Sequence, residues 1–132
     1  MKTMTIKQTV TFNASPHDVY EMLMDSEKHA EFTESPATIS RKVGGRFSTY
    51  DDYSTGTNIE LVQDKKIVQK WRGSDWPEGH YSVATFELEG AGVKTKLVFS
   101  QTDVPEDQYE AISEGWKEFY WEKMKKMIGN GK

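Results

Sequence analysis

The sequence predicts an α+β fold: a curved antiparallel sheet of about six to seven strands, wrapped on a long C-terminal helix, with two short helices after strand 1. Three observations predict it. Apolar and polar residues alternate along most of the chain after residue 37. The loops between these segments are too short for parallel crossovers. One amphipathic segment near the C-terminus is long enough to cover the apolar face that such a sheet must bury.

Composition limits the class of protein. The chain has 132 residues, enough for one domain and too few for two. It has no cysteine, which excludes disulfides and thiolate chemistry and favours a cytoplasmic location. The N-terminal residues alternate instead of forming an apolar signal sequence, and no run approaches the roughly 20 apolar residues of a membrane span. The net charge is −4 with both signs interleaved, so we expect a single domain over 1–132 that binds neither nucleic acid nor membrane.

The N-terminal third begins with a strand over residues 6–12, whose apolar side chains share one face. A helix then begins at Ser15. Serine can cap the helix, Pro16 suits its first position, and Asp18 completes a capping box. A second short helix is expected from Ser26.

The alternating segments predict six further strands, near 37–43, 46–50, 57–63, 66–73, 80–89 and 93–102. Glycine-rich or polar stretches between them predict turns, among them 54–56 and 90–92. Consecutive strands joined in this way pair antiparallel.

The C-terminal helix is expected from Pro105 to Ile128, with Gly129 as its end. Its acidic residues come first and its lysines last, which complements the helix dipole and explains the lysine cluster without a basic binding surface. Apolar residues three and four apart form its stripe: Tyr109, Ile112, Trp116, Phe119, Tyr120, Met124 and Met127.

Polar residues interrupt the inward faces of three predicted strands. The alternation places these residues inward: Ile67, Gln69 and Trp71; His80, Ser82, Ala84, Phe86 and Leu88; Thr95, Leu97, Phe99 and Gln101. An unpaired buried amide costs about 1–3 kcal/mol. The polar members therefore pair with one another, face a wet or ligand-filled cavity, or lie near strand ends and reach solvent.

A ligand-filled cavity would have the usual composition of a small-molecule site, apolar with a few placed polar groups. It would bind a small hydrophobic molecule between the sheet and the C-terminal helix. The expected lining is aromatic, with three polar anchors: Phe47, Trp71, Phe86, Phe99, Trp116 and Tyr120; Gln69, Ser82 and Gln101.

Catalytic patterns are missing from the sequence. It contains no zinc-protease histidine pair and no serine-nucleophile elbow, so no catalytic residue, metal site or cofactor is assigned. The predicted inward position of His80 supports only a third hypothesis, a cyclase-like enzyme. Asp51 and Asp52 have the pattern of a solvated turn. Trp76 and Pro77 lie at a predicted hairpin tip, where the tryptophan either tucks over the sheet edge or anchors a protein interface.

Six short runs occur in an order that is typical of one family. They are Phe12-Asn13-Ala14-Ser15-Pro16, Pro36-Ala37-Thr38, Gly44-Gly45-Arg46-Phe47, Ile67-Val68-Gln69-Lys70-Trp71-Arg72, Trp76-Pro77-Glu78-Gly79-His80 and Gly115-Trp116. Together they resemble the C-terminal domain of activators of the heat shock protein 90 ATPase, in the START-like (SRPBCC) helix-grip superfamily. The resemblance covers nearly the whole chain and implies the fold derived above.

The resemblance also implies a non-enzymatic binding or regulatory domain whose partner is a heat shock protein 90-type chaperone. In the eukaryotic activators a separate N-terminal domain carries much of the chaperone binding, and the C-terminal domain contacts the nucleotide-binding domains of the chaperone. We therefore expect a lone domain of this type to keep at most a weaker version of that contact. Binding of a small hydrophobic ligand remains the alternative.

Overall fold

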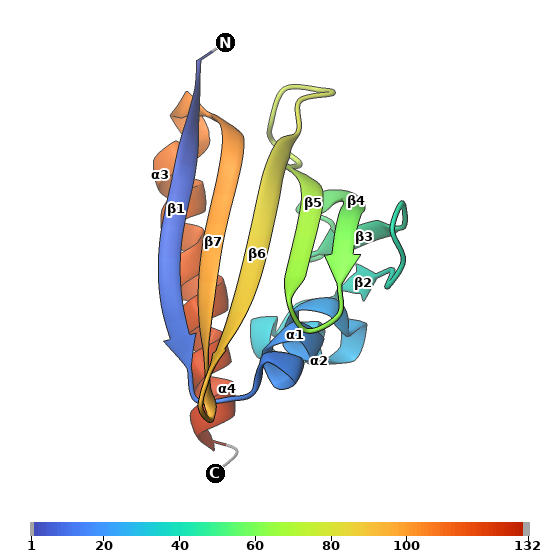
Figure 1. Ribbon diagram of the computed structural model, residues 1–132. Coiled ribbons are helices and arrows are strands. Elements are labelled where there is room, and N and C mark those ends of the chain that lie inside the picture. The colour runs from blue at the N-terminus through green and yellow to red at the C-terminus, as the bar shows by residue number, and fades with distance from the viewer. Residues whose placement is uncertain (1, 131–132) are drawn as a thin grey trace.

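The computed structural model describes residues 2–130. It confirms the predicted fold class, because seven antiparallel strands form one sheet in the order β1-β7-β6-β5-β4-β3-β2 (Figure 1). The strands are β1 (Thr3–Phe12), β2 (Thr38–Ile39), β3 (Arg46–Thr49), β4 (Ser54–Val62), β5 (Lys66–Gly73), β6 (Ser82–Ala91) and β7 (Lys94–Pro105). The helices are α1 (Pro16–Met24), α2 (Ser26–Thr33), the 3₁₀ turn η1 (Glu106–Gln108), α3 (Tyr109–Gly115), the π-helical segment η2 (Trp116–Trp121) and α4 (Glu122–Asn130).

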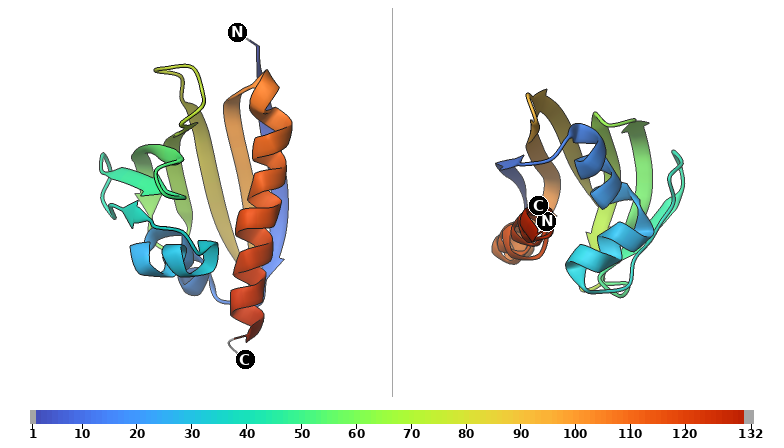
Figure 2. Two further views of the ribbon diagram at one scale, coloured as in Figure 1. Left: turned by 180° about the vertical axis from the view of Figure 1, so that it is seen from behind. Right: turned by 90° about the horizontal axis from the view of Figure 1, so that it is seen from below.

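All helices lie on one face of the sheet (Figure 2). The segments α3, η2 and α4 form one continuous helix that runs alongside β1 and β7, and α1 and α2 lie over the rest of that face at one end (Figure 2). The expectation that the C-terminal helix alone spans every strand is therefore wrong. No helix among the described residues is both long and apolar enough to cross a membrane.

The start of α1 follows its sequence signals. Ser15 is the N-cap and its side chain accepts a hydrogen bond of 3.1 Å from the backbone N–H of Asp18, while Pro16 occupies the first turn. The cap of α2 is Asp25, whose carboxylate accepts from the backbone N–H of Lys28 at 3.1 Å. Asp25 is also the C-cap of α1, so this one residue ends α1 and starts α2.

The sheet register brings the predicted inward residues together. Phe86 lies opposite Ile67 on one side and Phe99 on the other, and Ala84 lies between Gln69 and Gln101. All of these side chains are buried. The expected alternation is therefore confirmed in β5, in β7, and in β6 from Ser82 onward.

The bounds of β2, β4 and β6 differ from the prediction. Residues 54–56 were expected as a turn, but they begin β4, and the turn lies before them. Gly56 is a close-approach glycine, because an added Cβ would lie 1.7 Å from the carbonyl oxygen of Lys70 on β5. The strand expected from His80 begins instead at Ser82, and the strand expected over 37–43 is only Thr38–Ile39.

The C-terminal helix differs from a regular α-helix at one place. Trp116 to Trp121 form a π-helical turn, in which each turn holds more residues than in an α-helix. The wider turn rotates Trp121 inward, where it is 4% exposed, and Phe119 outward, where it is 47% exposed. The expected inward position of Phe119 is therefore wrong, and Trp121 takes its place in the core.

Candidate functional site

The nine residues predicted to line a cavity are all buried and gather around Trp116. The Trp116 ring centroid lies 4.4 Å from that of Tyr120 and 4.5 Å from that of Phe99. The rings of Trp71 and Phe86 follow at 5.8 Å and 5.7 Å. Edge-on and tilted pairs at these separations add to the energy of burial. We refer to these five rings as the Trp116 cluster.

A chain of hydrogen bonds satisfies the polar residues beside this cluster. Trp116 Nε1–H donates to Gln101 Oε1 at 2.8 Å, and Gln101 Nε2–H donates to Ser82 Oγ at 2.8 Å. The Ser82 hydroxyl in turn donates to the carbonyl oxygen of Trp71 at 2.8 Å. Gln101 and Ser82 are both 0% exposed. Of the three alternatives, pairing is therefore confirmed, and access to solvent is wrong for these two residues.

Gln69 pairs with a residue that the sequence reasoning missed. Its Nε2–H donates to Asn58 Oδ1 at 3.0 Å. Asn58 is 2% exposed, and its own amide donates to the carbonyl oxygens of Ser40 and Lys42 at 2.7 Å and 3.0 Å. This pair connects β5 to the loop before β3. The alternation of β4, taken from Ser54, was the signal that places Asn58 inward.

A buried histidine was also missed. His29 on α2 is 4% exposed, and its Nδ1 lies 3.2 Å from the carbonyl oxygen of Leu23. Because a carbonyl only accepts, Nδ1 carries the proton, and Nε2 accepts the hydroxyl hydrogen of Tyr120 at 3.0 Å. Burial lowers the pKa of His29 to about 4, against the opposing effect of the bond to Leu23. His29 lies three residues before the apolar Phe32 on the same helix, and this spacing was the signal in the sequence that could have placed His29 on the buried face.

The space enclosed beside the Trp116 cluster is small. Its volume is about 20 Å³, which is enough for one water molecule. A drug-sized ligand needs roughly 300 Å³ or more. It is lined by Leu23, His29, Ile39, Phe47, Thr49, Ile67, Gln69, Trp71, Phe86, Trp116 and Tyr120. The predicted lining residues thus form a packed core, and their role in ligand binding stays a prediction.

A larger, open groove, which we call the apolar groove, lies on the other side of the same rings. It has a volume of about 390 Å³ between the C-terminal helix and the segment before β4. Its lining is mostly aromatic and aliphatic: Tyr50, Tyr53, Ser54, Trp71, Ala111, Ile112, Gly115, Trp116, Phe119 and Tyr120. The Tyr50 hydroxyl donates to the carbonyl oxygen of Phe119 at 2.8 Å and joins the two sides. Burial raises the pKa of both Tyr50 and Tyr53, that of Tyr53 to about 12.

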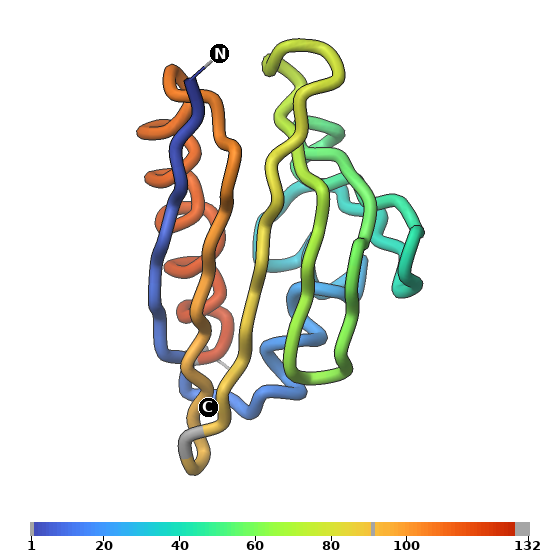
Figure 3. Tube along the Cα trace, turned by 45° about the horizontal axis from the view of Figure 1, so that its top comes forward, coloured from blue at the N-terminus to red at the C-terminus, as the bar shows by residue number. Residues whose placement is uncertain are grey.

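The tip between β5 and β6 projects beyond the end of the sheet (Figure 3). Trp76 is only 4% exposed and its ring centroid lies 5.3 Å from that of Trp71, so the tryptophan is tucked over the sheet. Arg72 Nη2–H donates to the carbonyl oxygens of Trp76 at 2.7 Å and Pro77 at 3.3 Å. Pro77 and Glu78 are exposed. Any interface at this tip therefore uses Pro77 and its neighbours, with Trp76 as their support.

His80 does not occupy the predicted inward position. It precedes β6, its Nε2 lies 2.7 Å from the carbonyl oxygen of Asp103, and its ring packs on Trp76 at 6.0 Å. It lines neither the enclosed space nor the apolar groove. The cyclase-like hypothesis rested on this histidine and loses its support. Asp51 and Asp52 are exposed, as expected of a solvated turn.

The fold is that of a START-like domain. The chain belongs to the family described as activator of Hsp90 ATPase homolog 1-like protein, which matches residues 13–129. It is 34% identical over 127 residues to the human activator of 90 kDa heat shock protein ATPase homolog 1, covering 96% of this chain and 37% of the relative. It is 37% identical over 117 residues to the Dictyostelium discoideum homologue, covering 87% of this chain and 30% of that protein.

The chain thus spans well under half the length of these relatives. Among solved structures it is similar to PFC0360w, described as an HSP90 activator from Plasmodium falciparum, with a TM-score of 0.89, 26% identity and 96% of both chains covered. The Aha1 dimer from Colwellia psychrerythraea shares the fold, with a TM-score of 0.81 at 18% identity over 95% of this chain and 96% of that one. The human and Dictyostelium discoideum relatives and PFC0360w are named as activators.

Proposed function

We propose that this domain is a co-chaperone-like regulator that binds a heat shock protein 90-type chaperone and raises its ATPase rate. The observation that carries the proposal is similarity over nearly the whole chain to proteins named as activators of that ATPase, including a solved structure of matching extent. We also propose a cytoplasmic location, where the domain would encounter such a chaperone.

The packing supports binding through the surface. The enclosed space of about 20 Å³ leaves no room for a partner's side chain in the core. The β5–β6 tip offers Pro77 and Glu78 on a base fixed by Trp76 and by the two hydrogen bonds of Arg72. A loop that is held in one shape before binding loses little conformational entropy in the complex. We therefore assign the tip, residues 74–80, as the contact surface.

The test is the ATPase rate of the host's own chaperone with and without the untagged domain. Glu78→Lys reverses a charge at the tip, and Glu89→Lys makes the same change on exposed residue 89, near the end of β6 that leads into β7. Figure 1 shows this end of β6 opposite the tip. We expect the wild type and Glu89→Lys to stimulate the rate equally and Glu78→Lys to stimulate it less. Equal stimulation by all three proteins would show that the tip is not the contact surface. If the wild type does not bind the chaperone, the proposed function is wrong.

The apolar groove favours a second candidate function, binding of a small hydrophobic molecule. Its volume of about 390 Å³ is in the range of ligand sites, and three of the predicted lining residues, Trp71, Trp116 and Tyr120, border it. Native mass spectrometry of the domain purified from its host tests this candidate. A wild-type mass that includes a bound small molecule, which Phe119→Asp lacks, supports this candidate. A wild-type mass equal to that of the polypeptide alone contradicts it.

A further inference from the structure

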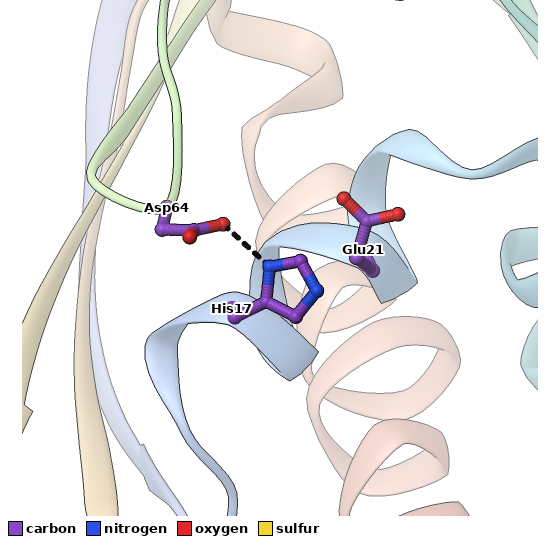
Figure 4. A group of neighbouring side chains, drawn as sticks. All are labelled: His17, Glu21 and Asp64. Carbon is purple, nitrogen blue, oxygen red and sulfur yellow. Dashed lines mark hydrogen bonds and ion pairs between the residues drawn. The ribbon is translucent and has the colours of Figure 1, made fainter.

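Three ligand-type side chains meet at the end of the sheet where α1 begins (Figure 4). His17 and Glu21 are four residues apart on α1 and share one face of the helix. Asp64 comes from the turn between β4 and β5, at a left-handed backbone position with φ of 61°. His17 Nδ1 lies 3.0 Å from Asp64 Oδ1. One donor atom from each of the three residues lies within 4.8 Å of the others.

This donor set suits a divalent transition-metal ion. Imidazole nitrogen and carboxylate oxygen bind Zn²⁺ at about 2.0–2.2 Å, which places two ligands of a tetrahedral ion about 3.4 Å apart. The His17 and Asp64 atoms are already this close. A donor oxygen of Glu21 lies within 4.8 Å of the other two donor atoms, and its partly exposed side chain can rotate to close this distance. Three protein ligands leave the fourth position for water.

The neighbours leave each carboxylate able to bind an ion. Arg41 Nη2–H donates to Glu21 Oε2 at 2.5 Å, which leaves Oε1 for an ion. Asp64 Oδ1, the oxygen that lies 3.0 Å from His17 Nδ1, accepts from Gln63 Nε2–H at 2.7 Å and keeps a second lone pair for the ion. Hydrogen bonds of this kind orient metal ligands. Arg41 and the N-terminal end of the α1 dipole oppose a cation, but two carboxylates outweigh one guanidinium.

We propose that His17, Glu21 and Asp64 form a binding site for a divalent transition-metal cation, with Zn²⁺ as the ion that fits best. A bound ion joins the first turn of α1 to the β4–β5 turn, two segments that are otherwise connected at this point by the single bond between His17 and Asp64. The site is separate from the β5–β6 tip, so it stands or falls independently of chaperone binding.

Isothermal titration of the untagged, chelator-treated domain with ZnCl₂ tests the proposal. We expect one ion per chain, and a loss of affinity of about tenfold or more in His17→Ala and in Asp64→Asn. The matched controls are His80→Ala and Glu31→Gln, which remove a histidine and an exposed acid elsewhere and should leave the affinity unchanged. All four positions lie outside the buried core, and circular dichroism checks that each variant folds.

Three results would overturn the proposal. One is the absence of Zn²⁺ binding by the wild type. Another is binding that survives in His17→Ala or that disappears in His80→Ala, because the ion is then held by other groups. Equal affinity for Mg²⁺ and Zn²⁺ also contradicts it, since an imidazole ligand favours the transition metal.

Discussion

The buried histidine predicts a specific loss of stability in mild acid. His29 has an ordinary pKa of 6.5, and burial lowers its pKa in the folded domain to about 4. Between these values the unfolded chain binds a proton that the folded domain does not, so the free energy of unfolding falls as the pH drops from 6.5 towards 4. Above pH 6.5 this group has no effect. The loss from His29 alone is about 2 kcal/mol at pH 5 and about 3 kcal/mol below pH 4.

Urea unfolding of the wild type and of His29→Gln at several pH values between 8 and 5 measures this effect. Glutamine can still donate to the Leu23 carbonyl and accept from Tyr120, but it does not titrate. The exposed carboxylates titrate in both proteins and cancel in the comparison. We expect the wild type to lose about 2 kcal/mol more than the variant between pH 8 and pH 5. A difference between the two proteins that stays constant across this range refutes the assigned burial and tautomer of His29.

Three further predictions concern the core. Trp116→Phe leaves Gln101 Oε1 buried without its hydrogen-bond donor. It should therefore lower the free energy of unfolding by about 1–3 kcal/mol more than the lost packing does. The double variant with Gln101→Leu should recover part of this free energy. Gly56→Ala should prevent stable pairing of β4 with β5, because its Cβ meets the β5 backbone, and a wild-type thermal melt contradicts this. Trp121→Ala should lower the free energy of unfolding by about 3–5 kcal/mol, and Phe119→Ala by much less. If this segment were a regular α-helix, Phe119→Ala would have the larger effect.

Patterns of period two and the α1 cap could be predicted from the sequence because they depend on local geometry. The inward sets of β5, β6 and β7 follow directly from alternation, and the N-cap at Ser15 depends on neighbouring residues alone. The same alternation identified the polar residues of the buried hydrogen-bond chain. It did not show that Gln101 and Ser82 pair, since that depends on the register between β6 and β7.

The remaining differences arise from packing between distant segments. Glycine often indicates a turn in a sequence. At Gly56, however, glycine is needed because the backbone of β5 lies too close for a side chain. Trp121 lies five residues after Trp116, and both are buried because a π-helical turn changes the helical period. His29 lies on a short polar helix and is buried only because Tyr120 and Phe32 pack on its ring, at 5.2 Å and 4.9 Å.

The proposed co-chaperone role is tested most directly by recording the amide NMR spectrum of the isotope-labelled domain as unlabelled host chaperone is added. We expect the amide signals of Glu78, Gly79 and His80 to broaden or shift first, while those of the β6–β7 turn, at the other end of the sheet, change little. A spectrum that stays unchanged at chaperone concentrations in excess of the domain contradicts the proposed function.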